Sequence, residues 1–357
     1  MPLDRASQGN RVKALPRPGG PYLVGSSTCE LTDTSRASHL LSRDRGRKLL
    51  VKCWYPASET APDGCRRERL WEQLRDEPNM PGVAKLLLRP AMKVRTNSYR
   101  DAPYAMRAGA PRIVFYSHGL ISFASENSML MEHLAGRGYV LIALQHVEQL
   151  SEFRELQKTQ RQDEREEQAR LQRKLKASSV SERPGLRKEY FRIASNTNRI
   201  VAGRCADVEY AVSALERIIR GIPGVDGLSA RAPVGAIGLS LGGAVATEYA
   251  KRSGEKPSCV VNMDGGIYGA EREKPIDTRY LMLYSQENDG TNDACLAASG
   301  GTEITRRTIA GTKHLNFHDI AAVYPALKWL GVIGPANPMA VIDERNRSIS
   351  DFLDACR

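Results

Sequence analysis

The sequence predicts an α/β fold in which a mostly parallel central sheet is flanked by helices. Short apolar runs of strand character alternate with helix-like segments from residue 112 onward. Parallel strands need such crossovers, because the chain must travel back across the sheet before it pairs again. The 357 residues are 41% apolar and 26% charged, which is ordinary for a globular protein and ample for a sizeable core.

The first part of the chain is expected to hold an arm, an antiparallel strand pair and an insertion. Residues 1–20 are rich in Pro, Gly and Arg, which is typical of a flexible arm, and we expect one domain over residues 21–357. Prolines interrupt residues 56–110, which indicates an insertion ahead of the central sheet. The elements expected up to residue 144 are strands over 22–31 and 48–55, helical pieces over 70–75 and 83–88, a strand over 112–117, a helix over 127–137 and a strand over 139–144.

A charged helical insertion is predicted at about 149–190. Glu, Gln, Arg and Lys dominate residues 149–176, and the apolar positions form only a thin stripe of Phe153, Leu156, Leu171 and Leu175. This composition favours a solvated helix, with a mobile lid or a membrane-contacting helix as the alternative. A break over 178–185 follows, and a better amphipathic helix is expected over 196–220.

The second half begins with a strand, a tight turn and a helix. An apolar run over 233–237 leads into Gly238-Leu239-Ser240-Leu241-Gly242, and a helix-like segment follows over 244–252. Such a Gly-x-Ser-x-Gly turn holds the serine in a strained conformation with its hydroxyl exposed, and this context predicts a nucleophile at Ser240 on an α/β-hydrolase fold. The remaining expected elements are strands over 258–263, 280–284 and 303–309 and helices over 320–330 and 339–353.

A serine nucleophile needs a general base oriented by a carboxylate. On this fold the acid and then the histidine follow the serine in the chain. His314 comes after the last expected strand and is the preferred base, whereas His318 lies inside the next helix-like segment, where a surface or capping role is more typical. Asp264 and Asp289 each follow a strand between Ser240 and His314, so chain order permits either as the acid, and generic topology favours Asp289.

The oxyanion hole requires two backbone N–H groups. One is expected from Leu241, directly after the nucleophile, and the other from Leu120 in the loop that follows the strand over 112–117. His118 precedes the serine and is expected to be a structural residue of that loop.

Charge and motifs limit the other function classes. The net charge is +11 and the pI is near 9.4, which is compatible with weak contact with an anionic membrane surface, but no nucleic-acid motif accompanies it. The seven cysteines show no Cys-x-x-Cys spacing, and no phosphate-binding glycine loop is present, so we expect no metal and no cofactor. No secretory signal or long apolar run is seen, which favours a cytoplasmic protein. The oligomeric state stays open.

Several motifs together resemble the platelet-activating factor acetylhydrolase family, the plasma-type group VII phospholipases A2, and related bacterial serine esterases. The stretches that carry the resemblance are 20–25 (GPYLVG), 51–56 (VKCWYP), 115–120 (FYSHGL), 237–243 (IGLSLGG), 262–265 (NMDG) and 314–317 (HLNF). The resemblance implies a calcium-independent esterase with Ser240, Asp264 and His314 as the catalytic triad. It therefore favours Asp264 over Asp289.

Two departures from that family concern the elbow. Leu239 stands where members often carry His, and Leu241 where an aromatic residue is common, so we expect a different acyl-pocket shape. The predicted function is a serine carboxylic-ester hydrolase that acts through an acyl-enzyme on short-chain esters or on a phospholipid like platelet-activating factor or an oxidised one. An acyltransferase with the same site is the alternative, and a non-catalytic binding module with a basic surface is a third hypothesis.

Overall fold

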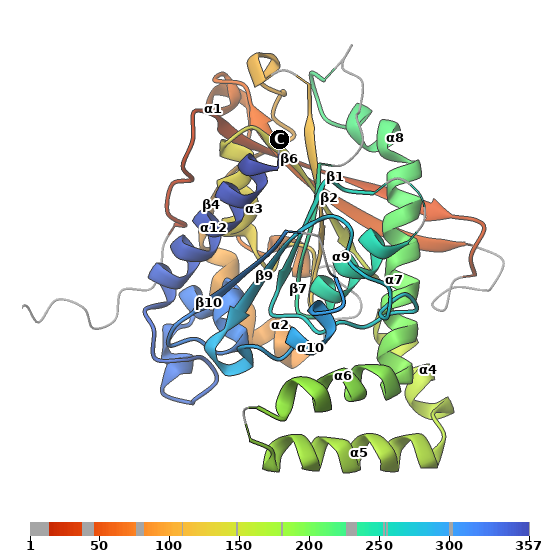
Figure 1. The fold of residues 1–357 in the computed structure, drawn as a ribbon. Helices are drawn as coiled ribbons and strands as arrows, with labels where there is room; N and C mark the ends of the chain where they lie inside the picture. Colours follow the sequence, from red (N-terminus) through yellow and green to blue (C-terminus); the bar gives the residue numbers. More distant parts are fainter. Residues whose placement is uncertain are drawn as a thin grey trace, which may run out of the picture.

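The structure is a computed structural model that describes residues 14–37, 46–75, 82–108, 110–147, 149–179, 181–225, 234–252, 254, 256–299 and 303–356. The first thirteen residues of the expected arm therefore lie outside the described residues, as does the first residue of the strand expected over 233–237. Figure 1 shows a central twisted sheet with helices on both of its faces and a helical projection at one end.

Ten strands of the described residues form one sheet in the order β10-β9-β8-β7-β5-β6-β2-β1-β4-β3. The neighbouring strands β10, β9, β8, β7, β5 and β6 all pair in parallel, whereas β2 is antiparallel to both β6 and β1. The mostly parallel sheet and the early antiparallel pair are thereby confirmed. The strand bounds are β1 Leu23–Asp33, β2 Arg47–Ala57, β3 Arg67–Arg69, β4 Arg95–Arg100, β5 Arg112–Ser117, β6 Tyr139–Gln145, β7 Gly235–Leu239, β8 Cys259–Met263, β9 Arg279–Ser285 and β10 Ile304–Ile309.

The central strands are apolar on both faces because helices cover both. In β5, Ile113 and Phe115 face one core cluster while Val114 and Tyr116 face the other. Helices α7, α8 and α9 lie on the first face and α3 and α12 on the second (Figure 1). Their bounds are α3 Ser128–Gly136, α7 Ser195–Ser213, α8 Leu215–Arg220, α9 Leu241–Lys251 and α12 Pro338–Ala355.

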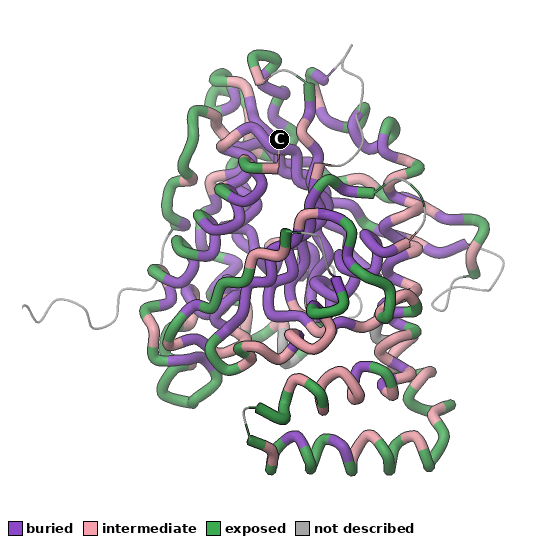
Figure 2. The backbone as a smooth tube through the Cα atoms, viewed as in Figure 1, coloured by how far each residue is buried: buried purple, intermediate pink, exposed green. Residues whose placement is uncertain are grey.

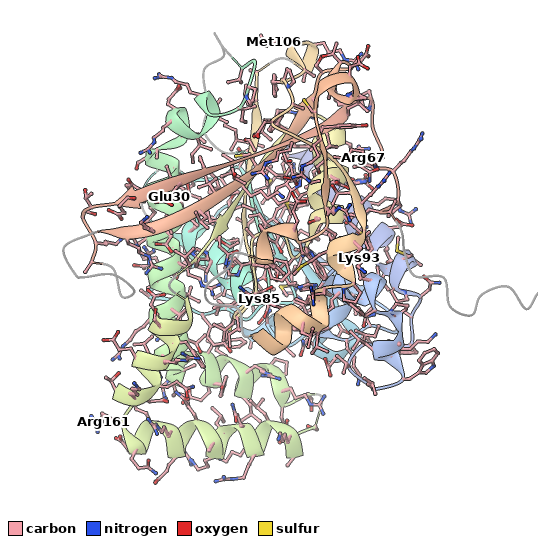
Figure 3. The ribbon with its side chains drawn as sticks, turned by 180° about the vertical axis from the view of Figure 1, so that it is seen from behind. Glu30, Arg67, Lys85, Lys93, Met106 and Arg161 are labelled. Atoms are coloured by element: carbon pink, nitrogen blue, oxygen red, sulfur yellow. The ribbon has the colours of Figure 1, made fainter. Side chains whose placement is uncertain are left out.

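The charged insertion is a group of three helices rather than one solvated helix. These are α4 Gln149–Thr159, α5 Gln162–Ala177 and α6 Arg183–Ile193, and they project beyond the sheet (Figure 1). Figure 2 shows mostly exposed and intermediate backbone there, in contrast to the buried sheet. Part of the apolar stripe nevertheless packs inside the insertion and away from solvent, since Leu171 and Leu175 are buried. Arg161, at the turn between α4 and α5, lies at the outer edge of the insertion (Figure 3).

Two expectations about local structure were wrong, and the expectation for the insertion over 56–110 was incomplete. Residues 14–20 do not form a free arm, because the Leu15 side chain is buried and its N–H donates to the Arg95 carbonyl at 2.8 Å. The insertion over 56–110 also contains strands β3 and β4, which were not predicted because their residues are mostly polar. The helix expected over 320–330 breaks at Pro325, which cannot continue the hydrogen-bond ladder. The short elements are α1 Ala61–Gly64, η2 Glu72–Arg75, α2 Gly82–Leu88, η3 Ala91–Lys93, η4 Met106–Ala108, η5 Gln286–Asn288, α10 Asp293–Leu296, η6 His314–Phe317, α11 Ile320–Val323 and η7 Pro325–Lys328.

Candidate active site

Ser240 occupies a sharp turn between β7 and α9. Its φ of 57° and ψ of −120° lie in a region that a non-glycine residue rarely adopts, which stores backbone strain of about 1–3 kcal/mol. The flanking glycines permit the turn, because a Cβ on Gly238 would lie 2.0 Å from the backbone of Gly242, and one on Gly242 would lie 1.9 Å from the Ser117 oxygen. The sequence therefore builds a strained turn at the carboxyl end of a central strand, which is the backbone geometry of a nucleophile elbow.

His314 and Asp264 are brought together from two different loops. His314 Nδ1 lies 2.7 Å from Asp264 Oδ2. The carboxylate is fixed on its other sides, since its Oδ1 accepts from the Ser285 N–H at 2.8 Å and its Oδ2 accepts from Ser285 Oγ at 2.9 Å and from Asn288 Nδ2 at 2.8 Å. An acceptor held in this way orients the imidazole with its proton on Nδ1, so that Nε2 is free to accept a proton.

The alternative site residues lie elsewhere. Asp289 is exposed, and its Oδ1 accepts from Thr308 Oγ1 at 2.5 Å. His318 is buried against the rings of Trp71 and Phe123, and its Nδ1 accepts from the Ile320 N–H at 2.9 Å. The expectation of a capping role for His318 agrees with that hydrogen bond, but the side chain is not at the surface.

The electrostatics of the pair suit a general base. Burial acts to lower the pKa of His314, but the hydrogen bond and the charge of Asp264 outweigh it and raise this pKa above the ordinary 6.5. Burial lowers the pKa of His318 to about 3, so that this ring stays neutral. The two downstream histidines thus differ in environment, and His314 alone contacts the Asp264 carboxylate.

The loop over 118–120, which we call the oxyanion loop, is clamped by buried side chains. The Gly119 carbonyl lies 2.7 Å from His118 Nδ1 and accepts from Arg204 Nη1 at 3.3 Å, and the same Arg204 atom donates to the His118 carbonyl at 2.9 Å. The Gly119 carbonyl belongs to the same trans peptide unit as the Leu120 N–H. Because these two groups point in opposite directions, clamping the carbonyl fixes the direction of the N–H.

Glu126 holds the other side of the oxyanion loop. Its Oε1 accepts from the Gly119 N–H at 3.0 Å and from the Tyr116 hydroxyl at 2.6 Å. Burial raises the pKa of Glu126 to about 7. The loop is therefore positioned by a buried polar network rather than by loop backbone alone.

A pocket of about 360 Å3 surrounds Ser240 and His314, which lies within the usual size range of small-molecule sites. Leu120 and Leu241 both line it. Leu239 does not, because its side chain is buried in the core cluster on the α3 and α12 side of the sheet. The expectation that Leu239 shapes the acyl pocket was therefore wrong. The full lining is Leu120, Arg187, Phe191, Thr197, Ser240, Leu241, Asp264, Gly265, Gly266, Tyr268, Asn288, Thr291 and His314.

Sequence reasoning missed Arg204, although a signal for it exists. Arg204 lies in the apolar stripe of α7, between Ile200, Val201 and Val208, where a charge is out of place unless it has buried partners. Glu126 and Asn288 carry no comparable signal, because each stands in a polar context that is typical of a turn.

Two general features of the described chain bear on the site. None of its helices is both long enough and apolar enough to cross a membrane. Over the same residues, no group of three or more His, Cys, Asp or Glu side chains is arranged to hold a metal ion.

The sheet order, the elbow at the end of β7 and the helices on both faces define an α/β-hydrolase. A ferulic acid esterase from Streptomyces cinnamoneus shares this fold, with 18% identity, a TM-score of 0.65 and coverage of 97% of this chain and 93% of that one. The model of the family "platelet-activating factor acetylhydrolase, isoform II" matches residues 7–356, and the chain therefore belongs to this family and is an ester hydrolase.

A dienelactone hydrolase from Anabaena variabilis is 16% identical, with coverage of 85% of this chain and 95% of that one and a TM-score of 0.35. A search of the curated proteins found no match.

Proposed function

We propose that this protein is a serine carboxylic-ester hydrolase that works through an acyl-enzyme on short-chain esters or on phospholipids like platelet-activating factor. The observation that carries the proposal is the 2.7 Å contact between His314 Nδ1 and Asp264 Oδ2 in the pocket that Ser240 also lines. Family membership supports an ester as the substrate.

Each group has a defined part in the proposed reaction. Ser240 Oγ attacks the ester carbonyl while His314 Nε2 takes its proton, and Asp264 stabilises the imidazolium that forms. The N–H groups of Leu120 and Leu241 stabilise the oxyanion. His314 then gives its proton to the leaving alcohol, and water, activated by the same imidazole, cleaves the acyl-enzyme to release the acid and restore Ser240.

Solvent access favours hydrolysis over acyl transfer. The His314 side chain is 34% exposed, so water can reach the imidazole. An acyltransferase with this triad would have to keep water from the acyl-enzyme. Product analysis distinguishes the two reactions, because hydrolysis yields free acid even when glycerol is present, whereas transfer yields acylated glycerol.

The experiment that tests the function compares the wild-type protein with Ser240→Ala on p-nitrophenyl acetate. We expect saturable hydrolysis by the wild type and a loss in kcat of about 10⁴-fold or more in the variant. Circular dichroism would show that the variant is folded. Retained activity in a folded Ser240→Ala protein would refute the proposed nucleophile.

A further inference from the structure

The charged insertion forms part of the wall of the candidate active site. Arg187 and Phe191 of α6 and Thr197 at the start of α7 line the same pocket as Ser240 and His314. The helical projection that composition presents as a solvated surface therefore contributes side chains to the substrate site.

The charged side chains that line this pocket differ in whether they have a partner. Asp264 and His314 contact each other, and the remaining charged side chain in the lining is Arg187. Among the described residues, no ion-pair or hydrogen-bond partner faces its guanidinium. Arg192 on the same helix is different, because it forms an ion pair with Glu189 at 2.6 Å. Arg187 thus presents a half-buried positive charge to the pocket, and no anionic side chain within the described part of the chain pairs with it.

Two aromatic side chains line the pocket together with Arg187. Phe191 and Tyr268 form an edge-to-face pair with ring centroids 4.6 Å apart, which gives the pocket an apolar wall beside the guanidinium. Burial and the nearby Tyr190 raise the pKa of Tyr268, and the charge of Arg187 acts in the opposite direction. Lys188, the next residue, lines a separate small cavity with Cys295 and so does not share this position.

We propose that Arg187 binds a negatively charged carboxylate or phosphate group of the substrate, so that the insertion selects anionic esters. A guanidinium matches both groups because its planar N–H fork can donate two parallel hydrogen bonds to their oxygens. The substrate would place its ester carbonyl at Ser240, its apolar part against Phe191 and Tyr268, and its anion at Arg187. This inference rests on the proposed function of the pocket and names the substrate class within it.

The test measures kcat/KM for matched pairs of charged and neutral esters. The carboxylate pair is mono-p-nitrophenyl glutarate and its methyl ester, corrected for spontaneous hydrolysis, and the phosphate pair is acetylglycerol 3-phosphate and acetylglycerol. We expect the wild type to prefer the anionic member of at least one pair, and the pair that shows the preference identifies the anion. Arg187→Gln should reduce that preference about 10- to 100-fold, as expected for hydrogen bonds to a charged group.

Arg192→Gln is the matched control, since it removes a positive charge from the same helix outside the pocket and should keep the wild-type preference. Salt should weaken the preference in the wild type and have little effect in Arg187→Gln. Equal hydrolysis of charged and neutral esters by the wild type, or an unchanged preference in Arg187→Gln, would overturn the inference.

A binding measurement separates this inference from the proposed function. Titration calorimetry of the folded Ser240→Ala protein with glutarate and with glycerol 3-phosphate requires no turnover. We expect at least one of the two anions to bind, and to bind about 10-fold or more weakly when Arg187→Gln is added. Absence of binding to both, or binding that is indifferent to Arg187→Gln, would overturn the Arg187 assignment, whereas anion binding by a wild type that hydrolyses no ester would contradict the proposed function instead.

Discussion

Asp264→Asn and Asp289→Asn form a matched pair that tests the orientation of the base. The Asp264 carboxylate accepts from His314, from Asn288 and from both the N–H and the hydroxyl of Ser285. An asparagine at this position has one acceptor oxygen and an NH₂ group, which cannot accept from all of these donors. With the NH₂ toward the ring, His314 Nδ1 must become the acceptor and the proton moves to Nε2, where it blocks proton transfer from Ser240.

We therefore expect Asp264→Asn to lower kcat on p-nitrophenyl acetate by about 10⁴-fold, the magnitude of the wrong tautomer in a catalytic triad. The kcat of Asp289→Asn should stay within about two-fold of the wild-type value, because Asp289 is an exposed side chain that accepts a hydrogen bond from Thr308. Thermal melting should show both variants folded. A large loss in Asp289→Asn together with an active Asp264→Asn would refute this assignment of the acid.

Three further predictions concern the oxyanion loop, pH and the elbow. Arg204→Met removes the hydrogen bonds that hold the oxyanion loop and should lower kcat about 10- to 100-fold, less than the loss of an oxyanion donor itself, with a smaller change in KM. An unchanged kcat in a folded variant would show that Arg204 does not position the loop. The kcat/KM of the wild type should fall on the acid side with a midpoint above pH 6.5, because the base must be neutral and Asp264 raises the pKa of His314; a midpoint below 6.5 would contradict it. Gly238→Ala should lower the free energy of unfolding, measured in urea, by more than about 3 kcal/mol, because its Cβ would lie 2.0 Å from the Gly242 backbone. Gly203→Ala is the control, since its Cβ would meet nothing within 4 Å, and it should leave stability unchanged or raise it by about 0.5–1 kcal/mol. Equal effects of the two substitutions would contradict the close packing of the elbow.

The central strands were predictable because helices bury both of their faces. Continuous apolar runs such as the one over 112–117 stand out from the flanking sequence, and β5 has the expected bounds. Strands β3 and β4 were missed because they lie at the sheet edge and read Arg-Glu-Arg and Arg-Thr-Asn-Ser-Tyr-Arg. Their place depends on pairing with β1 and with each other, which is a tertiary effect that local pattern does not contain.

The candidate site was predictable where function leaves a local pattern. The Gly-x-Ser-x-Gly turn at Ser240 and the chain order of His314 could be recognised from the sequence, but the residues alone left Asp264 and Asp289 open as acids. The distinction depends on which loop turns toward His314, and only the resemblance pointed to Asp264. The place of Arg204 in an apolar stripe signals a buried charge, but its partners, like the approach of Arg187 to the pocket, depend on how helices α6 and α7 pack and leave no local pattern.

The most direct test of the account is covalent labelling of the native protein with a fluorophosphonate, followed by peptide mass spectrometry. We predict one adduct per chain, on Ser240, with labelling slowed strongly by His314→Ala because the hydroxyl then lacks its base. Labelling at another residue, or equal labelling rates in the wild type and a folded His314→Ala protein, would contradict the account.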